Sequence, residues 1–362
     1  MRARHCPIAI LIAGLLTAGA ASAQAPVQIV PPTQPNAAPA PKPAPKPPKP
    51  AKPAVKPAAA PPTAPATSPP SASAREPDLA FGAFQRGYFL TAFHEATKRV
   101  NATGDAKAMT LLGELYANGL GVPNNDTEAV RWYKLAGERG DREAMFALAM
   151  FRIGGRGGPR DHGEASRLLA AAAKLGHPAA AYDLGLLYME GQQFPQDFGR
   201  AAELFRLAAQ AGSPEAQYAL ATLYKEGRGV PKDEREAARL MAAASLADLL
   251  DASVEYAIAL FNGTGVTKNE PGAVALFRKA AMRGSPIAQN RLARVLAAGR
   301  GTAADPVEAI KWHLISKAGG ASDTFLDDFA QKQSADTRAA AEKAAKPWID
   351  LLAQVHMSSA AR

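Results

Sequence analysis

The apolar and polar positions of residues 105–320 follow one pattern that returns every 36 residues without a gap. In each period, an apolar stripe at helical spacing ends at a glycine, and a second stripe follows, which ends at another glycine in all periods but the fourth. In the third period, the first stripe contains Leu184 and precedes Gly191, and the second contains Phe205 and precedes Gly212. The pattern therefore predicts six repeats of two helices each.

Three positions of the period carry the same small residue in all six repeats. The first is Ala108, Ala144, Ala180, Ala216, Ala252 and Ala288, the second is Gly119, Gly155, Gly191, Gly227, Gly263 and Gly299, and the third is Ala129, Ala165, Ala201, Ala237, Ala273 and Ala309. Small residues let helices approach closely. Because a single helix pair has no core of its own, stacking of the repeats must create one. We therefore predict an all-α fold, an α/α superhelical repeat solenoid.

The ends of the predicted helices are marked by recurring residues. A short side-chain oxygen precedes each second helix, as an N-cap requires. This column contains Asn125, Asp161, Asp197, Asp233, Asn269 and Asp305. Glycine follows most second helices, where it adopts the left-handed conformation at low cost. Asp248 takes the place of this glycine after repeat four, so we expect a remodelled junction between repeats four and five.

The two ends of the array need caps, because a terminal repeat exposes an apolar face. We predict an N-terminal cap over residues 79–104, with one helix over residues 84–103. We predict a C-terminal helical cap over residues 321–362, with two helices between residues 323 and 354. The second of these helices is expected to start near Ser334.

Residues 1–23 have the organisation of a secretory signal peptide. Arg2 and Arg4 precede 14 mostly apolar residues, and Ala21-Ser22-Ala23 provides the small residues of a cleavage site. We expect cleavage after Ala23 and secretion to the periplasm, with an uncleaved anchor as the alternative. The apolar run is shorter than the about 20 residues of a transmembrane helix, and no other run is long enough. We therefore do not expect an integral membrane protein.

Residues 24–78 form a predicted linker that is rich in proline, alanine and lysine. Residues 24–74 contain 18 prolines, five lysines and no aromatic residue. This composition favours a disordered, extended chain, because it cannot bury enough apolar surface to offset the entropy of ordering. Two interpretations are open. The segment is a solvated spacer that sets how far the repeat array can extend, or it is a cationic tail that binds peptidoglycan or another anionic envelope polymer.

The formal net charge of +9 does not indicate a nucleic-acid-binding domain. Residues 1–75 contain eight of the 42 Lys and Arg residues and no Asp or Glu, which leaves 34 basic and 33 acidic residues in the remainder. The array is thus nearly neutral. The single cysteine, Cys6, lies in the predicted signal peptide. The mature chain therefore offers no disulfide, no Cys-ligated zinc site and no cysteine nucleophile.

The motifs of the repeat are most complete in the first one: Leu112-Gly113-Glu114-Leu115-Tyr116, then Gly119-Leu120-Gly121-Val122, then Trp132-Tyr133. On a helix–loop–helix of this length, they resemble the Sel-one-like repeat (SLR) family of tetratricopeptide-like solenoids, as a secreted bacterial member. The resemblance covers residues 84–320. Two repeats depart from it, with Arg152 at the tyrosine position and Gln193 in place of the second loop glycine. The resemblance implies a protein-binding or scaffolding role. One secreted branch of the family has a disulfide in each repeat and is linked to β-lactam binding; this chain lacks those cysteines.

The sequence contains no recognisable catalytic motif. Ser-x-x-Lys, Gly-x-Ser-x-Gly and His-Glu-x-x-His are absent, and the histidines outside the signal peptide occupy different repeat positions. The groove of a solenoid is made of exposed helix faces, which do not shift pKa values as a closed pocket does. We therefore predict no enzyme, no metal site and no cofactor.

Two sets of residues are candidates for binding. One is a semi-apolar line on the first helices, at two repeat positions four residues apart that share a helix face. Its members are Phe146, Met150, Tyr182, Leu186, Tyr218 and Ile258. If exposed, they suit an extended peptide or helix; if not, they pack between repeats. The other set is Arg152, Arg156 and Arg160, which lie among glycines and suit an anion, with a solvated loop as the alternative.

These observations favour a periplasmic, non-catalytic scaffold or adaptor that binds a protein of the cell envelope on its concave surface. A rigid, preformed surface loses little entropy on binding. The alternative is a glycan- or peptidoglycan-binding envelope protein that uses its cationic tail and its groove. A hydrolase or drug-binding enzyme is the third class. Salt separates the first two, because polymer binding through charge weakens when salt screens it.

Overall fold

The computed structural model describes residues 78–360, and this part of the chain contains 16 helices and no strand. The predicted signal peptide and almost all of the predicted linker lie outside the described residues. The six repeats consist of α3 (Ala106–Asn118) and α4 (Asp126–Glu138), α5 (Arg142–Gly154) and α6 (His162–Lys174), α7 (Pro178–Glu190) and α8 (Phe198–Gln210), α9 (Pro214–Glu226) and α10 (Glu234–Leu246), α11 (Leu250–Asn262) and α12 (Glu270–Met282), and α13 (Pro286–Ala298) and α14 (Pro306–Ala318).

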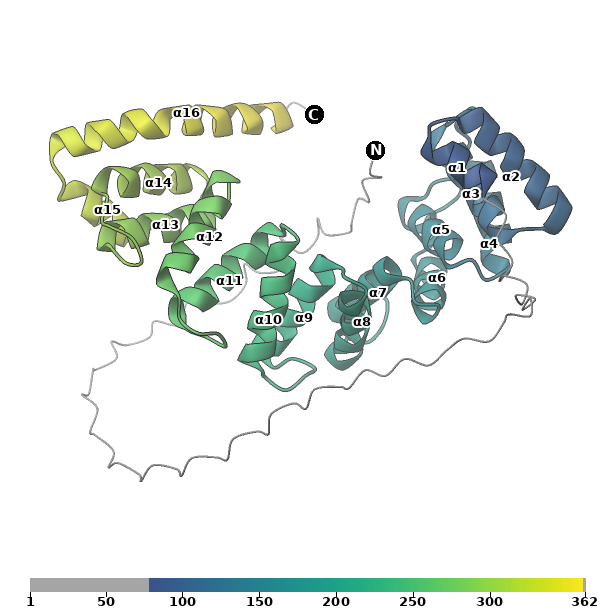
Figure 1. Cartoon of the computed structure of the whole chain (residues 1–362), viewed down its shortest axis with the longest axis horizontal. Coiled ribbons are helices and arrows are strands. Elements are labelled where there is room, and N and C mark those ends of the chain that lie inside the picture. The colour runs from purple at the N-terminus through teal and green to yellow at the C-terminus, as the bar shows by residue number, and fades with distance from the viewer. Residues whose placement is uncertain (1–77, 361–362) are drawn as a thin grey trace, which may run out of the picture. The chain divides into compact units, whose positions relative to one another are not determined.

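Each of these helices packs against the helix before it and the helix after it, so the repeats follow one another in chain order (Figure 1). This arrangement is a repeat solenoid, and it confirms the predicted fold. The two columns of invariant alanines line the contacts between helices, where every member is at most 4% exposed. Gly113 and Gly185 make room for aromatic rings. A Cβ at either position would lie 2.6 Å from the ring of Tyr133 or Phe205, respectively.

The six predicted N-caps are confirmed. In each second helix of a repeat, the side-chain oxygen of the capping residue accepts a hydrogen bond from a backbone N–H two or three residues later. At α10, the carboxylate of Asp233 accepts from the N–H groups of Arg235 and Glu236, both at 3.0 Å. These bonds satisfy donors that have no partner within the helix.

Replacing Asp233 with alanine is expected to lower the free energy of unfolding by about 1 kcal/mol, because the start of α10 loses its cap. Asp233→Asn should be nearly neutral, since Asn125 and Asn269 cap the equivalent helices. Chemical denaturation followed by circular dichroism measures both changes. Equal losses in the two variants would show that the charge, and not the cap, is what matters at this position.

Asp248 does not remodel the junction between repeats four and five, so that expectation was wrong. Its φ is +63°, in the left-handed region that glycine occupies at Gly212 and Gly284. Contacts from α12 and from its C-cap residue hold the aspartate there. Lys279 donates to its carboxylate at 2.7 Å, and Arg283 donates to its backbone carbonyl at 3.0 Å. The helices on both sides keep the same length as in the other repeats.

The N-terminal cap differs from the prediction, because it contains two helices, α1 (Leu79–Gln85) and α2 (Phe89–Thr103). Gly87, with a φ of +80°, lies in the turn between them. The single helix expected over residues 84–103 was therefore wrong at its start. The helix α2 packs against α3 and begins the array.

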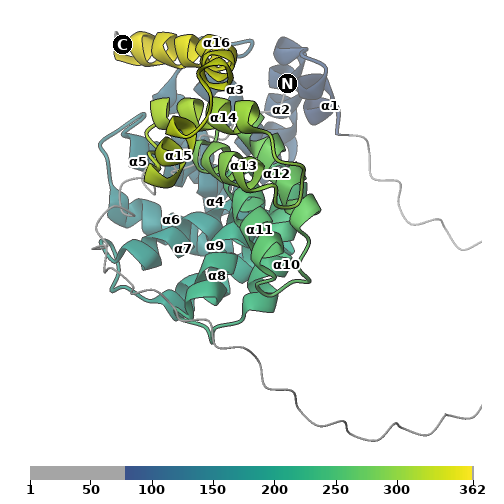
Figure 2. The same ribbon diagram turned by 90° about the vertical axis from the view of Figure 1, so that its left-hand side faces the viewer.

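The C-terminal cap contains α15 (Thr324–Gln331) and α16 (Ala335–Ala360), which confirms the predicted pair of helices. The Ser334 hydroxyl accepts a hydrogen bond from the N–H of Thr337 at 3.2 Å, at the start of α16. The helix α16 packs along α14, as Figures 1 and 2 both show. The rings of Trp312 and Trp348 lie 5.5 Å apart at this contact. Within residues 78–360, no helix is long and apolar enough to cross a bilayer.

In five of the six repeats, the second glycine of the loop contacts the preceding helix pair. This column contains Gly121, Gly157, Gly229, Gly265 and Gly301, all with φ between +63° and +73°. A Cβ at any of them would lie 1.9 to 2.8 Å from a backbone atom at the start of α2, α4, α8, α10 or α12, respectively. The absence of a side chain thus allows backbone to touch backbone, and this contact joins neighbouring repeats.

Candidate partner-binding surface

The six residues of the predicted semi-apolar line are not equally accessible. Phe146, Met150, Tyr218 and Ile258 are half-buried, whereas Tyr182 and Leu186 are only 8% and 4% exposed. The Tyr182 ring lies 5.6 Å from the ring of Phe205, and burial raises the pKa of Tyr182 to about 12. Tyr182 and Leu186 belong to the core between helices. The structure therefore corrects the expectation that these two residues contact a partner.

Phe146 also takes part in packing between repeats. Its ring stacks on the imidazole of His177, with ring centroids 4.4 Å apart and planes 23° apart. His177 caps α7, because its Nδ1 accepts from the N–H of Ala180 at 3.1 Å, which leaves Nε2 to donate to Glu143 at 3.0 Å. The hydrogen bond from His177 lowers the pKa of Glu143. Phe146 therefore contributes to the contact between repeats two and three.

The arginines of the predicted anion site already have acceptors within the protein. Arg152 Nε donates to Glu164 at 2.6 Å, and Arg156 donates to both carboxylate oxygens of Asp126. Arg160 is exposed in the loop that follows. The structure therefore corrects the anion-site expectation for Arg152 and Arg156, because neighbouring carboxylates occupy their guanidinium groups.

The position of Arg156 recurs in repeats four and six as part of a contact between repeats. Arg228 lies over Phe198 at 3.9 Å and Arg300 over Phe261 at 4.3 Å, each a ring of the preceding repeat. Arg156 lies over Phe151 of its own repeat at 4.1 Å. Arg156 and Arg300 also bind a carboxylate at the start of the preceding second helix. Cation–π contact and ion pairing together explain why arginine occurs at this position.

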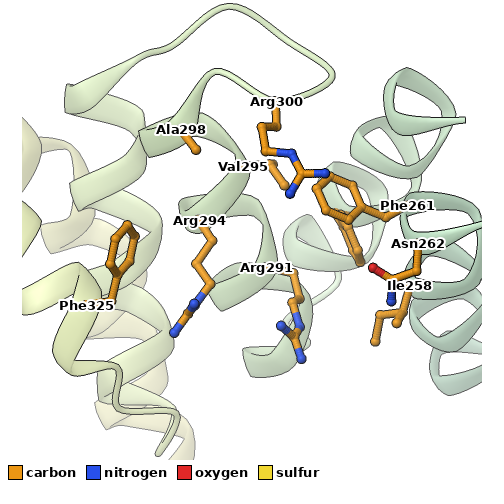
Figure 3. Close-up of a pocket in the computed structure, with 10 residues that line it drawn as sticks. Ile258, Phe261, Asn262, Arg291, Arg294, Val295, Ala298, Arg300 and Phe325 are labelled. Carbon is orange, nitrogen blue, oxygen red and sulfur yellow. The ribbon is translucent and has the colours of Figure 1, made fainter. Parts of the chain in front are cut away.

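A cavity of about 310 Å³ lies between α11 and α13 and reaches the start of α15 (Figure 3). Its apolar walls include Ile258, Phe261, Val295 and Phe325, and its polar lining includes Arg291, Arg294 and Arg300. Figure 3 shows Arg291 and Arg294 between the side chains of Phe325 and Phe261. Of the residues in the predicted semi-apolar line, Ile258 borders this cavity. The cavity thus combines cationic groups with aromatic and aliphatic surface on the first helices.

Two of the three cavity arginines have carboxylate partners. Arg294 binds both oxygens of Asp323 through Nε and Nη2, at 2.5 and 2.8 Å, and Arg300 binds Glu270. Arg291 is exposed on α13 and has no hydrogen bond or ion pair with any described residue. One uncompensated positive charge therefore faces solvent beside two compensated ones.

A smaller cavity of about 150 Å³ lies on the opposite side of α11, against α9 and α10. It shares Ile258 and Asn262 with the larger cavity. An ion pair between Lys225 and Glu255, at 2.7 Å, lies at its edge. The two cavities therefore flank one helix and are separated by few side chains.

Among residues 78–360, no group of three or more His, Cys, Asp and Glu side chains is arranged to hold a metal ion. Burial raises the pKa of the Asp183 carboxyl group, in α7, to about 7. Asp183 does not line either of the two cavities.

Comparison with protein families gives consecutive matches along the array. The Sel1 repeat family matches residues 106–141, 142–177, 178–213, 214–249, 250–285 and 286–320, which together make up more than half of the chain. The chain belongs to the Sel1 repeat family. Sel1 repeat proteins generally mediate protein–protein interaction, and the repeat scaffold is generally non-catalytic.

Solved Sel1 repeat structures share the fold. The structure of c5321, a protective antigen of uropathogenic Escherichia coli with an SLR fold, is 25% identical, covers 75% of this chain and 67% of its own, and has a TM-score of 0.54. A Sel1 repeat protein from Oxalobacter formigenes is 24% identical, covers 66% of this chain and 94% of its own, and has a TM-score of 0.56. Comparison with curated proteins finds no match. The predicted SLR resemblance is confirmed.

Most residues that line this cavity of the Sel1 repeat protein could not be predicted from the sequence. Arg294 occupies the repeat position of Met150 and Ile258, so extending the predicted line into the sixth repeat would have found it. Arg291 and Phe325 give no such signal. The position of Arg291 holds a different type of residue in most repeats, and Phe325 lies in the C-terminal cap.

Proposed function

We propose that this Sel1 repeat protein is a non-catalytic scaffold that binds a protein partner on the surface of its first helices. The observation that carries the proposal is the cavity between α11 and α13, where apolar walls and cationic groups meet on that surface. Pockets of about 300 Å³ or more are typical of binding sites. Because helix packing forms the cavity before a partner arrives, binding costs little ordering entropy.

The proposed place of action is the periplasm, and the proposed partner is a protein of the cell envelope. The signal-peptide pattern of residues 1–23 supports this location. The proline-rich segment that follows would let the array extend away from the N-terminus, by about 3.1 Å per residue in an extended polyproline II conformation. The array itself, with nearly balanced charge, would provide the specific contact.

In-cell photo-crosslinking tests this proposal. A photoreactive residue at Asn262, which is exposed and borders both cavities, is expected to give a discrete protein adduct in the periplasmic fraction. The same residue at Arg278, exposed on the second helix α12, provides the matched control. Such probes react over short distances, so only the position at the binding surface should capture the partner.

Equal adducts from both positions, or an adduct from Arg278 alone, would contradict binding on the first helices. A smear of cell-wall polymer in place of a discrete protein would favour the peptidoglycan alternative. An adduct that forms only in the cytoplasmic fraction would contradict the proposed location.

A further inference from the structure

We propose that the cavity between α11 and α13 binds a short acidic peptide segment of a partner protein, with a carboxylate at Arg291 and an adjacent apolar side chain between Phe261 and Phe325. This inference rests on the proposed scaffold function and specifies the chemistry of its partner. It concerns the last two repeats and the start of the C-terminal cap.

The charge of the cavity favours a carboxylate ligand. Arg291, Arg294 and Arg300 line it, and no acidic side chain is among its lining residues. Asp323 and Glu270 hold the guanidinium groups of Arg294 and Arg300 in place from outside the cavity. Arg291 has no acceptor among the described residues, so all N–H donors of its guanidinium group are available to a ligand. Arginine binds a carboxylate through two parallel hydrogen bonds, which fix the ligand in orientation as well as in place.

The walls of the cavity favour a peptide over a polyphosphate or a polyanionic glycan. Phe325 is 50% exposed, and Phe261 and Ile258 are half-buried, so apolar surface remains available beside the arginines. A purely polar polyanion would leave this surface without a partner. A peptide that alternates acidic and apolar side chains satisfies both the charges and the walls.

The size of the site favours a short segment over a folded surface. About 310 Å³ holds only a few side chains. The second cavity shares Ile258 and Asn262 with the first, but Glu234 and Glu255 line it, so the acidic side chain of the peptide belongs in the first cavity. The cationic segment over residues 24–74 of this chain is an unsuitable occupant, because it has five lysines and no acidic residue.

Selection from a display library of random short peptides on the full mature chain tests the proposal. Selected peptides are expected to carry Asp or Glu next to Leu, Ile, Phe or Trp. For a selected peptide, Arg291→Gln should weaken binding about tenfold, because a charge-assisted pair of hydrogen bonds is lost. Phe325→Ala should also weaken it, through loss of apolar contact. Isothermal titration of each variant measures these changes.

Arg278→Gln is the matched control, since it removes the same charge from an exposed position outside the cavity. Its affinity should match that of the unchanged chain, and circular dichroism should show that all variants are folded. Equal affinities of Arg291→Gln and Arg278→Gln would overturn the proposal. So would selected peptides without acidic residues, or tighter binding of inorganic polyphosphate or of a muropeptide at the same site. If these tests fail while the Asn262 crosslink still captures a protein, the scaffold function stands and only the acidic-peptide assignment falls.

Discussion

Replacing Gly265 with alanine is expected to lower the free energy of unfolding by about 3 kcal/mol, through a clash and a strained backbone together. The Cβ would lie 1.9 Å from the carbonyl oxygen of Glu234 and 2.3 Å from its carbonyl carbon, at the start of α10. Backbone atoms of a capped helix cannot move aside as a flexible side chain can. The φ of +67° at Gly265 adds a conformational cost for any L-residue. Repeats four and five must then separate slightly, which weakens the packing between them.

Gly284→Ala is the control that separates these two causes. Gly284 has a φ of +88°, but no atom lies within 4 Å of an added Cβ. This variant should therefore lose only about 1 kcal/mol, the cost of the left-handed conformation. Chemical denaturation compares the two variants, and hydrogen exchange in α10 and α11 assigns the loss to one contact, since stability in a repeat array is a sum over neighbours. Equal losses would show that close backbone contact does not join these repeats.

The third repeat shows what happens when this glycine is missing. Gln193 stands at the equivalent position and does not have a positive φ. Its loop instead places Phe194 against Tyr188, with ring centroids 4.9 Å apart and planes 19° apart. This stacking is a contact within the third repeat, between α7 and the loop that follows it. The departure from the family motif therefore corresponds to a different loop, while the helices on both sides keep their length.

The local structure of the array could be predicted from the sequence because it depends on single residues at fixed positions. Asp161 caps a helix, and Gly212 allows a positive φ, in any helical repeat. The outcome at Asp248 could not be predicted, because Lys279 and Arg283 reach it from α12, about 30 residues away. Contacts between repeats decide such cases, and the period alone does not specify them.

The candidate site was harder to predict for the same reason. Tyr182 and Tyr218 occupy the same repeat position, yet Tyr182 is buried and Tyr218 is half-buried. The ring of Tyr182 packs against Phe205, and Met241 takes the place of Phe205 in repeat four. The cavity at Arg291 depends on residues of α11, α13 and the C-terminal cap together. A repeat pattern shows what the repeats share, whereas this site is formed by what makes the last two repeats different.

Asp183 also distinguishes its repeat from the others. Burial of its ionised carboxylate costs free energy. It is 5% exposed within α7, where repeats two and four have Ala147 and Ala219. Burial raises its pKa from 3.8 to about 7. Its carboxylate has no hydrogen-bond partner among the described residues. The folded protein therefore favours the protonated carboxyl, while the unfolded chain ionises at lower pH.

The sign of the pH dependence follows from this difference. Because the folded-state pKa is raised, the contribution of Asp183 to the free energy of unfolding is most favourable below about pH 4. This contribution falls as the pH rises towards about 7. Each pKa unit is worth about 1.4 kcal/mol, so ionisation costs up to about 4 kcal/mol at about pH 8. Asp183→Asn removes this cost. The variant is expected to gain up to that amount of stability at about pH 8, and to gain nothing below about pH 4. Chemical denaturation across this range measures the gain, with Asp328→Asn, at an exposed position in α15, as the control. A gain independent of pH would show that ionisation of Asp183 is not what limits stability here.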